Sequence, residues 1–284
     1  MLFLLLILLG IIASGLFIYY TQYLNNGIIY WSIPIVIIAM ILLVALFVIF
    51  ILYIVTIFIR TDKKLDKPSK FCRVVTKMFA EFLTGLFRIK FVKKGFEKLP
   101  ENRNCLFIGN HQSNIDPFAN VWVFRKKDVA FIMKDAIMKV PVLGRWLYGS
   151  GFLPLDRNND RKAVEIINTA ANRIVTGDQS IFVYPEGTRS KGPNMNKFRN
   201  GVFKIALKAK CPIVVTIMDN TYRIKLRFPF RRTKVLVEVV GVIEYDVIKE
   251  MNTNQIGDMI HNMMTSRLEE RREELDFLAL KDNK

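Results

Sequence analysis

The pattern of apolar and charged positions divides the chain into two parts. No charged side chain precedes Arg60, and residues 1–20 and 33–59 are apolar almost throughout. About 20 residues of helix cross the hydrocarbon core of a bilayer, so the first segment is just long enough and the second is ample. The sequence therefore predicts a transmembrane hairpin over residues 1–59, with its two spans at about 1–20 and 33–59.

The residues that flank the two segments predict an orientation for the hairpin. The aromatic side chains at the ends of the spans fit an interfacial belt (Tyr19, Tyr20, Tyr30 and Trp31). Basic residues follow the second span directly, at Arg60, Lys63, Lys64, Lys67 and Lys70. By the positive-inside rule this end faces the cytoplasm, and two spans place the N-terminus on the same side. A cleaved signal peptide over residues 1–20 is the alternative, but the segment lacks a basic start and a small-residue cleavage site.

Residues 60–91 form a basic juxtamembrane segment followed by an amphipathic pattern. Between Phe71 and Phe91 apolar residues recur at helical spacing and alternate with charged ones. Two placements fit this helix: it lies on the bilayer surface, or it covers one face of a sheet.

Residues 92–284 alternate short apolar runs with helical patterns. Strands are expected at Ile89–Val92, Cys105–Ile108, Val129–Met133, Gly151–Leu155, Ser180–Tyr184, Ile213–Ile217 and Val235–Val242. Helices are expected at Phe118–Phe124, Val142–Tyr148, Arg161–Val175, Phe198–Lys208 and Gln255–Leu280. This alternation predicts one α/β domain whose mixed, largely parallel sheet is flanked by helices.

Composition narrows the partners of this domain. The formal net charge is +17, which favours an anionic partner such as a lipid headgroup or a phosphorylated substrate. The three cysteines are odd in number, widely spaced and surrounded by apolar residues, so we expect a reducing compartment, no disulfide framework and no metal site.

One stretch, Gly109–Pro117, carries the candidate chemistry. It contains His111 and Asp116 and follows the apolar run at Cys105–Ile108, so it lies at the carboxyl end of a strand, where α/β sheets usually keep their sites. Asp116 also fits a helix N-cap, with Pro117 at the first helical position.

Two interpretations of this pair compete. In the first, His111 is a polar loop residue and Asp116 only caps a helix. In the second, Asp116 accepts a hydrogen bond from one ring nitrogen of His111 and leaves the other nitrogen to take a proton from a hydroxyl. The second histidine, His261, falls on the C-terminal helix, and we expect it to be a surface or packing residue.

Further clusters of charged residues lie at the ends of other predicted strands. They are Gly151–Arg157, Tyr184–Ser190 and the strand opening at Lys210–Val215. The first two place Arg157 and Arg189 on loops that could converge near His111. An arginine fork is a natural partner for a phosphate.

In their order and spacing, these blocks resemble the four motifs of the glycerolipid acyltransferase family. The likeness runs from about Lys90 to Val242 and includes Phe198-Arg199-x-Gly201. Two positions depart from the family pattern. Tyr184 stands where phenylalanine is usual and Val215 where a second proline is usual; we expect both to be structural.

The resemblance implies acyl transfer from an acyl thioester, either acyl-CoA or an acyl carrier protein, to the free hydroxyl of a lysophosphatidate, which gives phosphatidic acid. His111 would be the general base and Asp116 its orienting partner. The residues implied for the acceptor phosphate are Glu186, Gly187, Thr188, Arg189, Arg157 and, as a weaker candidate, Lys134. We expect no cofactor, no metal and no nucleic acid, and the positive-inside rule places the catalytic domain at the cytoplasmic face of the membrane.

Three alternatives accompany this hypothesis. Another acceptor, such as glycerol 3-phosphate or a different lysolipid, would keep the chemistry and change the substrate. Cys105 as a nucleophile would change the mechanism, but it lies in an apolar strand with no basic group nearby to form a thiolate. A non-catalytic basic module that binds lipid or nucleic acid would not need His111 and Asp116 for its function. A nucleic-acid site would also need aromatic residues among the basic ones, and the one such stretch, Phe228–Arg232, fits an interfacial loop near lipid better.

Overall fold

Seven strands form one mixed sheet at the centre of this computed structural model, which describes residues 2–25, 33–59, 61, 65, 67–156 and 159–278. The strands are β1 (Ile89–Lys94), β2 (Leu106–Ile108), β3 (Val129–Lys134), β4 (Leu153–Leu155), β5 (Ser180–Val183), β6 (Ile213–Asp219) and β7 (Thr233–Ile243). Their order is β1-β7-β6-β2-β5-β3-β4, and every pair is parallel except β6 with β7. The predicted α/β class and all seven predicted strands are confirmed.

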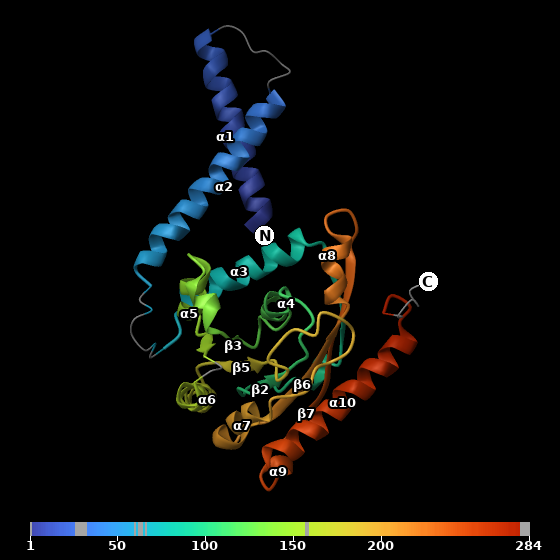
Figure 1. Cartoon of the computed structure of the whole chain (residues 1–284). Coiled ribbons are helices and arrows are strands. Elements are labelled where there is room, and N and C mark those ends of the chain that lie inside the picture. Colours follow the sequence, from blue (N-terminus) through green and yellow to red (C-terminus); the bar gives the residue numbers. More distant parts are fainter. Residues whose placement is uncertain are drawn as a thin grey trace.

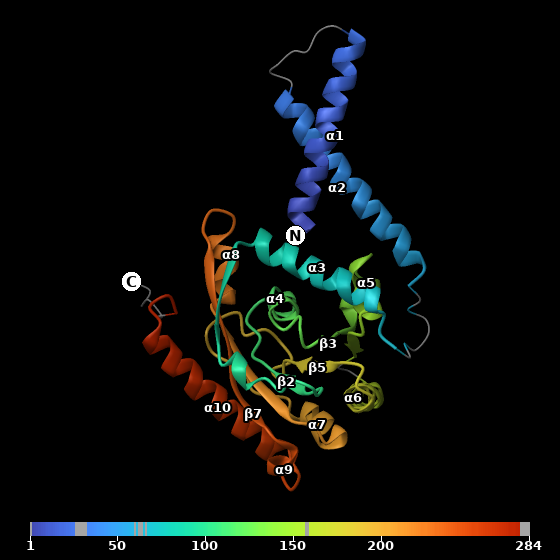
Figure 2. The same ribbon diagram turned by 180° about the vertical axis from the view of Figure 1, so that it is seen from behind.

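Helices cover both faces of the sheet. They are α3 (Lys70–Leu86), α4 (Asp116–Val123), α5 (Leu143–Gly149), α6 (Asp160–Val175), α7 (Lys204–Ala209), α8 (Ile224–Arg227), α9 (Tyr245–Ile248) and α10 (Thr253–Glu274). Figures 1 and 2 show α3 and α4 on one side of the sheet, with α6 and α7 on the other. The central strands β2 and β5 are buried throughout, as expected for parallel strands covered on both faces.

Two helices predicted in the second half of the chain have different bounds in the structure. The helix expected at Phe198–Lys208 starts later, because Arg199 is extended and donates its backbone N–H to the carbonyl of Pro185 at 2.8 Å. The C-terminal helix ends at Glu274 rather than Leu280, because the chain turns there and buries Leu278 against the core. The last two residues of that prediction lie outside the described part of the chain.

The N-terminal segments form two apolar helices, α1 (Leu2–Asn25) and α2 (Ile33–Ile57), which project from the α/β body in Figure 1. They cross where a Cβ added to Gly10 would lie 2.4 Å from Cγ1 of Ile41, so glycine allows the close approach. Within the described residues, α2 is long and apolar enough to span a bilayer over Pro34–Ile57, whereas the apolar part of α1 is shorter. The connection at 26–32 and Arg60, Lys63 and Lys64 lie outside the described residues.

The helix α3 joins this pair of helices to the α/β body. It buries a row of small side chains at four-residue spacing: Cys72, Thr76, Ala80 and Thr84. The larger Phe71 and Val74 remain exposed. The helix ends at Leu86 rather than at Phe91, because the chain from Ile89 onward pairs with β7. One face of α3 therefore covers the body while another presents apolar side chains outward.

Candidate active site

The register of β2 and β5 brings two loops together at the carboxyl edge of the sheet. Ile108 pairs with Val183, and three residues further along each chain stand His111 and Glu186. The backbone N–H of His111 donates to Oε1 of Glu186 at 2.7 Å. The loop that carries His111 and the loop that carries Glu186 are thus in direct contact.

Asp116 holds the imidazole of His111. Its Oδ2 atom lies 2.9 Å from Nδ1 of His111 and also accepts the backbone N–H groups of Gln112 at 2.6 Å and Ser113 at 2.7 Å. The Asp116 side chain is fully buried. An ionised carboxylate only accepts, so the shared proton belongs to Nδ1, and Nε2 is the ring atom left to accept a proton.

The helix-cap prediction for Asp116 is wrong. The helix α4 begins at Asp116, its N-cap is Ile115, and no side chain caps it. The carboxylate turns back to the preceding loop because the N–H groups of Gln112 and Ser113 satisfy it there. Pro117 does lie in the first turn of α4, as predicted.

Tyr184 forms a stacking partner for the imidazole. The rings of Tyr184 and His111 lie 4.3 Å apart with an interplanar angle of 14°. The phenol oxygen of Tyr184 accepts a hydrogen bond from Nδ2 of Asn120 at 2.9 Å, and burial raises the pKa of Tyr184 well above its ordinary value. The ring of His111 is therefore fixed by a stack on its face and by a carboxylate on its edge.

Glu186 is committed to the protein backbone. Its Oε1 accepts from His111 N, and its Oε2 accepts from the backbone N–H of Asn196 at 2.8 Å. Burial raises the pKa of this carboxyl group. The side chain is only 3% exposed, and its two carboxylate oxygens join the His111 loop to the Asn196 loop.

A second layer of buried polar groups supports the His111 loop. The side chain of Asn110 makes a two-way pairing with the backbone of Met218, at 2.8 Å in each direction. Nε2 of Gln112 donates to Oδ1 of Asp219 at 2.8 Å, and Oδ2 of Asp219 accepts from Nε of Arg272 at 2.8 Å. The loop is thus tied to β6 and, through Asp219, to α10.

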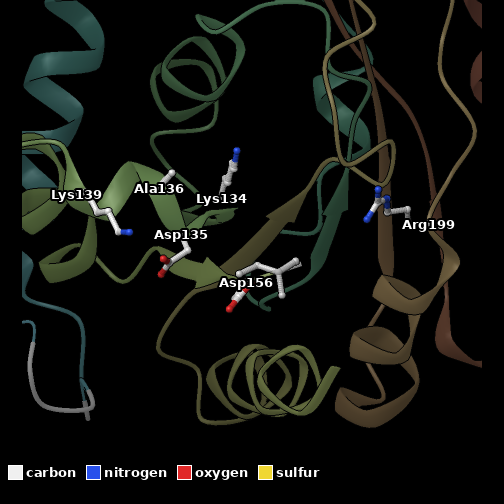
Figure 3. A pocket seen from close by; sticks show the side chains of 7 residues that line it. Lys134, Asp135, Ala136, Lys139, Asp156 and Arg199 are labelled. Carbon is white, nitrogen blue, oxygen red and sulfur yellow. The ribbon is translucent and has the colours of Figure 1, made fainter. Parts of the chain in front are cut away.

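A cavity of about 410 Å³ opens at the ends of β3 and β4 and reaches Arg199 (Figure 3). It is lined by Lys134, Asp135, Ala136, Lys139, Leu155, Asp156 and Arg199. Figure 3 shows Arg199 on one side and Lys134, Asp135 and Lys139 on the other. Gly187 has a φ of +70°, and a Cβ there would lie 3.1 Å from Cδ of Arg199, so this glycine lets the arginine pack against the turn. Three of the lining side chains are basic and two are acidic.

Several known proteins are similar to this chain in sequence or in fold. Residues 90–219 match the family model described as Acyltransferase. The chain carries an acyltransferase domain. A 1-acyl-sn-glycerol-3-phosphate acyltransferase of Haemophilus influenzae is 28% identical over 71% of this chain and 83% of its own length. The protein of the same name from Cocos nucifera is 30% identical over 60% of this chain but 55% of its own length.

A solved structure supports the fold of this acyltransferase. The crystal structure of the 1-acyl-sn-glycerophosphate acyltransferase PlsC from Thermotoga maritima superposes with a TM-score of 0.56. The match covers 70% of this chain and 79% of that chain at 20% identity. The protein is thus an enzyme, as predicted, and the non-catalytic alternative is set aside.

The predicted phosphate-binding residues of the acyltransferase fall in different places. Lys134 lines the cavity, Thr188 and Arg189 are exposed, and Arg157 lies outside the described residues. The strand before Arg157, β4, is three strands away from β2, which is about 14 Å at the usual strand spacing. Convergence of the two arginines near His111 therefore stays a prediction.

The two remaining candidates, Cys105 and His261, make packing contacts in the structure. Cys105 is buried, and desolvation raises its pKa to about 11, so its thiol stays protonated near neutral pH. His261 packs edge-on against Phe198 with ring centroids 4.8 Å apart. Within the described part of the chain, no group of histidine, cysteine and acidic side chains has the arrangement of a metal site.

Sequence reasoning missed four supporting residues of the acyltransferase site. Asn110 and Gln112 stand within the His111 block, but the sequence does not show that β6 would supply their partners. Asp219 and Arg272 are 53 residues apart and meet only because α10 packs against β6. The one signal in the sequence for these supporting residues was Asp219, an acidic residue at the end of an apolar run.

Proposed function

We propose that this acyltransferase moves a fatty acyl group from an acyl thioester to the free sn-2 hydroxyl of 1-acylglycerol 3-phosphate. The observation that carries the proposal is the buried carboxylate of Asp116 on Nδ1 of His111. It orients the ring, favours one tautomer and stabilises the imidazolium that forms when Nε2 takes up a proton. The relatives from H. influenzae and C. nucifera carry this acceptor in their names.

The reaction proceeds in one transfer without an acyl-enzyme. Nε2 of His111 accepts the hydroxyl proton while the hydroxyl oxygen attacks the thioester carbonyl carbon. The carbonyl oxygen becomes an oxyanion, which backbone N–H groups are suited to stabilise. The C–S bond then breaks, the ester carbonyl reforms, and the imidazolium returns its proton to the departing thiolate of coenzyme A or acyl carrier protein.

The acceptor phosphate is proposed to bind at the cavity beside the Glu186 loop. Lys134, Lys139 and Arg199 supply positive charge there, and Arg189 stands on the adjoining turn. Asp135 and Asp156 share the lining and reduce that charge, so the arginine and lysine side chains must outweigh them. Arg157, which comes two residues after β4 in the sequence, completes the proposed set.

The membrane supplies the acceptor in this proposal. The helix α2 is 25 residues, or about 37 Å, long, which exceeds the roughly 30 Å hydrocarbon core. The body that follows it, and the basic residues between them, are then at the cytoplasmic face. Both acceptor and product are amphiphiles, so an active site on a membrane-anchored body meets them without their leaving the bilayer.

The test is a matrix of donors and acceptors with a matched pair of histidine variants. The purified protein in nanodiscs is assayed with acyl-CoA and acyl carrier protein thioesters against lysophosphatidate, glycerol 3-phosphate and lysophosphatidylcholine. We expect transfer to lysophosphatidate to exceed the others, to disappear in His111→Ala and to persist in His261→Ala. Preference for another acceptor would replace the substrate assignment, and substantial activity in His111→Ala would overturn the mechanism.

A further inference from the structure

A short basic and apolar projection follows β6. It comprises α8 and the loop after it, residues 224–232, and it contains four basic side chains and no acidic one. Leu226 is 76% exposed and Phe230 is 85% exposed, which is the largest exposed fraction of any large apolar side chain among the described residues. Lys225, Arg231 and Arg232 are exposed beside them. The proposed acyl-transfer chemistry uses none of these residues.

The projection is held in place rather than left free. Ile224 anchors α8 in the core, where it is 2% exposed. The ring of Phe228 packs against that of Phe87 with centroids 5.0 Å apart. The guanidinium of Arg88 donates to the carbonyl oxygens of Pro229 at 3.0 Å and Phe230 at 3.2 Å. These contacts fix the backbone while they leave the Phe230 side chain pointing away from the body.

The projection lies on the same side of the body as the exposed apolar side chains of α3 and the apolar helices α1 and α2. Figures 1 and 2 show the orange loop beside α8 rising on the same side of the body as α3 and the α1–α2 pair. Its contacts with Phe87 and Arg88 place it just after the end of α3. On α3 the apolar side chains of Phe71, Val74 and Leu86 are also exposed. Exposed apolar side chains therefore lie near the start of α3 and, with Leu86 and the projection, at its other end.

We propose that residues 224–232 are a second membrane contact, in which Phe230 and Leu226 enter the interface and the neighbouring basic side chains bind anionic headgroups. Aromatic and aliphatic tips ringed by lysine and arginine are the side-chain chemistry of interfacial binding to anionic lipid. The inference rests on the proposed insertion of α2 but is independent of the acyl-transfer chemistry. With α2 as one point of attachment and this projection as another, the body is held at a fixed tilt to the bilayer.

The test measures immersion of spin labels in the full-length protein. Single nitroxides are placed by Phe230→Cys, by Leu46→Cys in α2 and by Val247→Cys on α9, which Figure 1 shows at the opposite end of the body. The native cysteines are buried, and unsubstituted protein gives the labelling background. In nanodiscs that contain phosphatidylglycerol, we expect labels 46 and 230 to be accessible to oxygen and protected from an aqueous nickel chelate. Label 247 should show the reverse.

The three labels separate the possible failures. If label 46 is protected and label 230 is as accessible to nickel as label 247, the projection is not a membrane contact and this inference is wrong. If label 46 is also exposed to nickel, the insertion of α2 fails and takes this inference with it. Neither result depends on whether the enzyme acylates lysophosphatidate. Protection of label 230 only after a soluble protein or nucleic acid is added would assign the surface to that partner instead.

A charge test uses two matched triple variants with label 230. Lys225→Gln, Arg231→Gln and Arg232→Gln remove three exposed charges from the projection, whereas Lys208→Gln, Lys210→Gln and Lys249→Gln remove three from distant surfaces. Each charge near an anionic surface changes local partitioning roughly fivefold. The first triple should shift label 230 toward water, and the second should not. Equal immersion in both triples, or in phosphatidylcholine alone, would overturn the role of anionic lipid.

Discussion

Oε1 of Glu186 accepts the backbone N–H of His111 at 2.7 Å, so the loops that carry these two residues meet through one partly buried hydrogen bond. The other carboxylate oxygen holds the loop at Asn196. Glu186 therefore helps to position the backbone of His111 relative to the sheet. The phosphate-binding role that the resemblance implied for Glu186 stays a prediction.

The variant Glu186→Gln is expected to lower both stability and activity. An amide has one oxygen, so either His111 or Asn196 would lose the acceptor for its buried N–H, at a cost of about 1–3 kcal/mol. Thermal unfolding in detergent and steady-state acyl transfer measure the two effects. Glu269→Gln on the exposed face of α10 is the control. A Glu186→Gln protein with an altered KM for the acceptor alone would instead support direct contact with the substrate.

The variant Asp116→Asn is expected to retain the fold and lose most of the activity. Its amide oxygen can take the place of Oδ2 and accept from Nδ1 and from the N–H groups of Gln112 and Ser113, but a neutral amide does not stabilise the imidazolium that forms during the reaction. We expect kcat to fall by about 10²- to 10⁴-fold, the usual contribution of a general base. Activity within a few-fold of the parent protein would show that the His111–Asp116 contact is structural only.

The variant Tyr184→Phe separates the stack from the hydrogen bond. A phenylalanine keeps the ring beneath His111, so kcat should change little. It leaves Nδ2 of Asn120 without its acceptor in a buried site, which should lower stability by about 1–3 kcal/mol. Thermal unfolding and kcat, measured together, test this. Tyr184→Leu, which removes the stack as well, should lower kcat; if it does not, the ring has no part in positioning the imidazole.

Particular residues show why the sequence predicted some features and missed others. Apolar runs such as Ile181–Val183 identify buried strands because both faces of a parallel sheet are covered. Their order in the sheet depends on how helices pack, and no local pattern revealed that β7 runs antiparallel to β6. Asp116 shows why one residue type can mislead, because an aspartate at this position can either cap the helix or accept a hydrogen bond from His111. For Glu186, the sequence motif identified the residue but did not predict its hydrogen bonds to the backbone of His111 and Asn196.

The variant Cys105→Ala tests the rival covalent mechanism. The Cys105 thiol is buried, and its pKa of about 11 leaves almost no thiolate at neutral pH. We expect acyl transfer to remain within a few-fold of the parent value, with a small loss of stability from the missing sulfur in the core. Activity measurements and mass spectrometry of the protein after exposure to acyl donor check this. An acylated Cys105 in the parent protein would revive the covalent mechanism.

The Arg272–Asp219 pair links α10 to the His111 loop, and a double-mutant cycle measures the link. Arg272→Met leaves the buried carboxylate of Asp219 unpaired and is expected to destabilise the protein by about 3–5 kcal/mol. Asp219→Asn keeps an oxygen for Gln112, so adding it to Arg272→Met should recover part of that loss. Thermal unfolding of the four proteins gives the coupling. Because Gln112 stands next to His111, kcat should follow the same order, and unchanged kcat in Arg272→Met would show that α10 supports the fold without positioning the base.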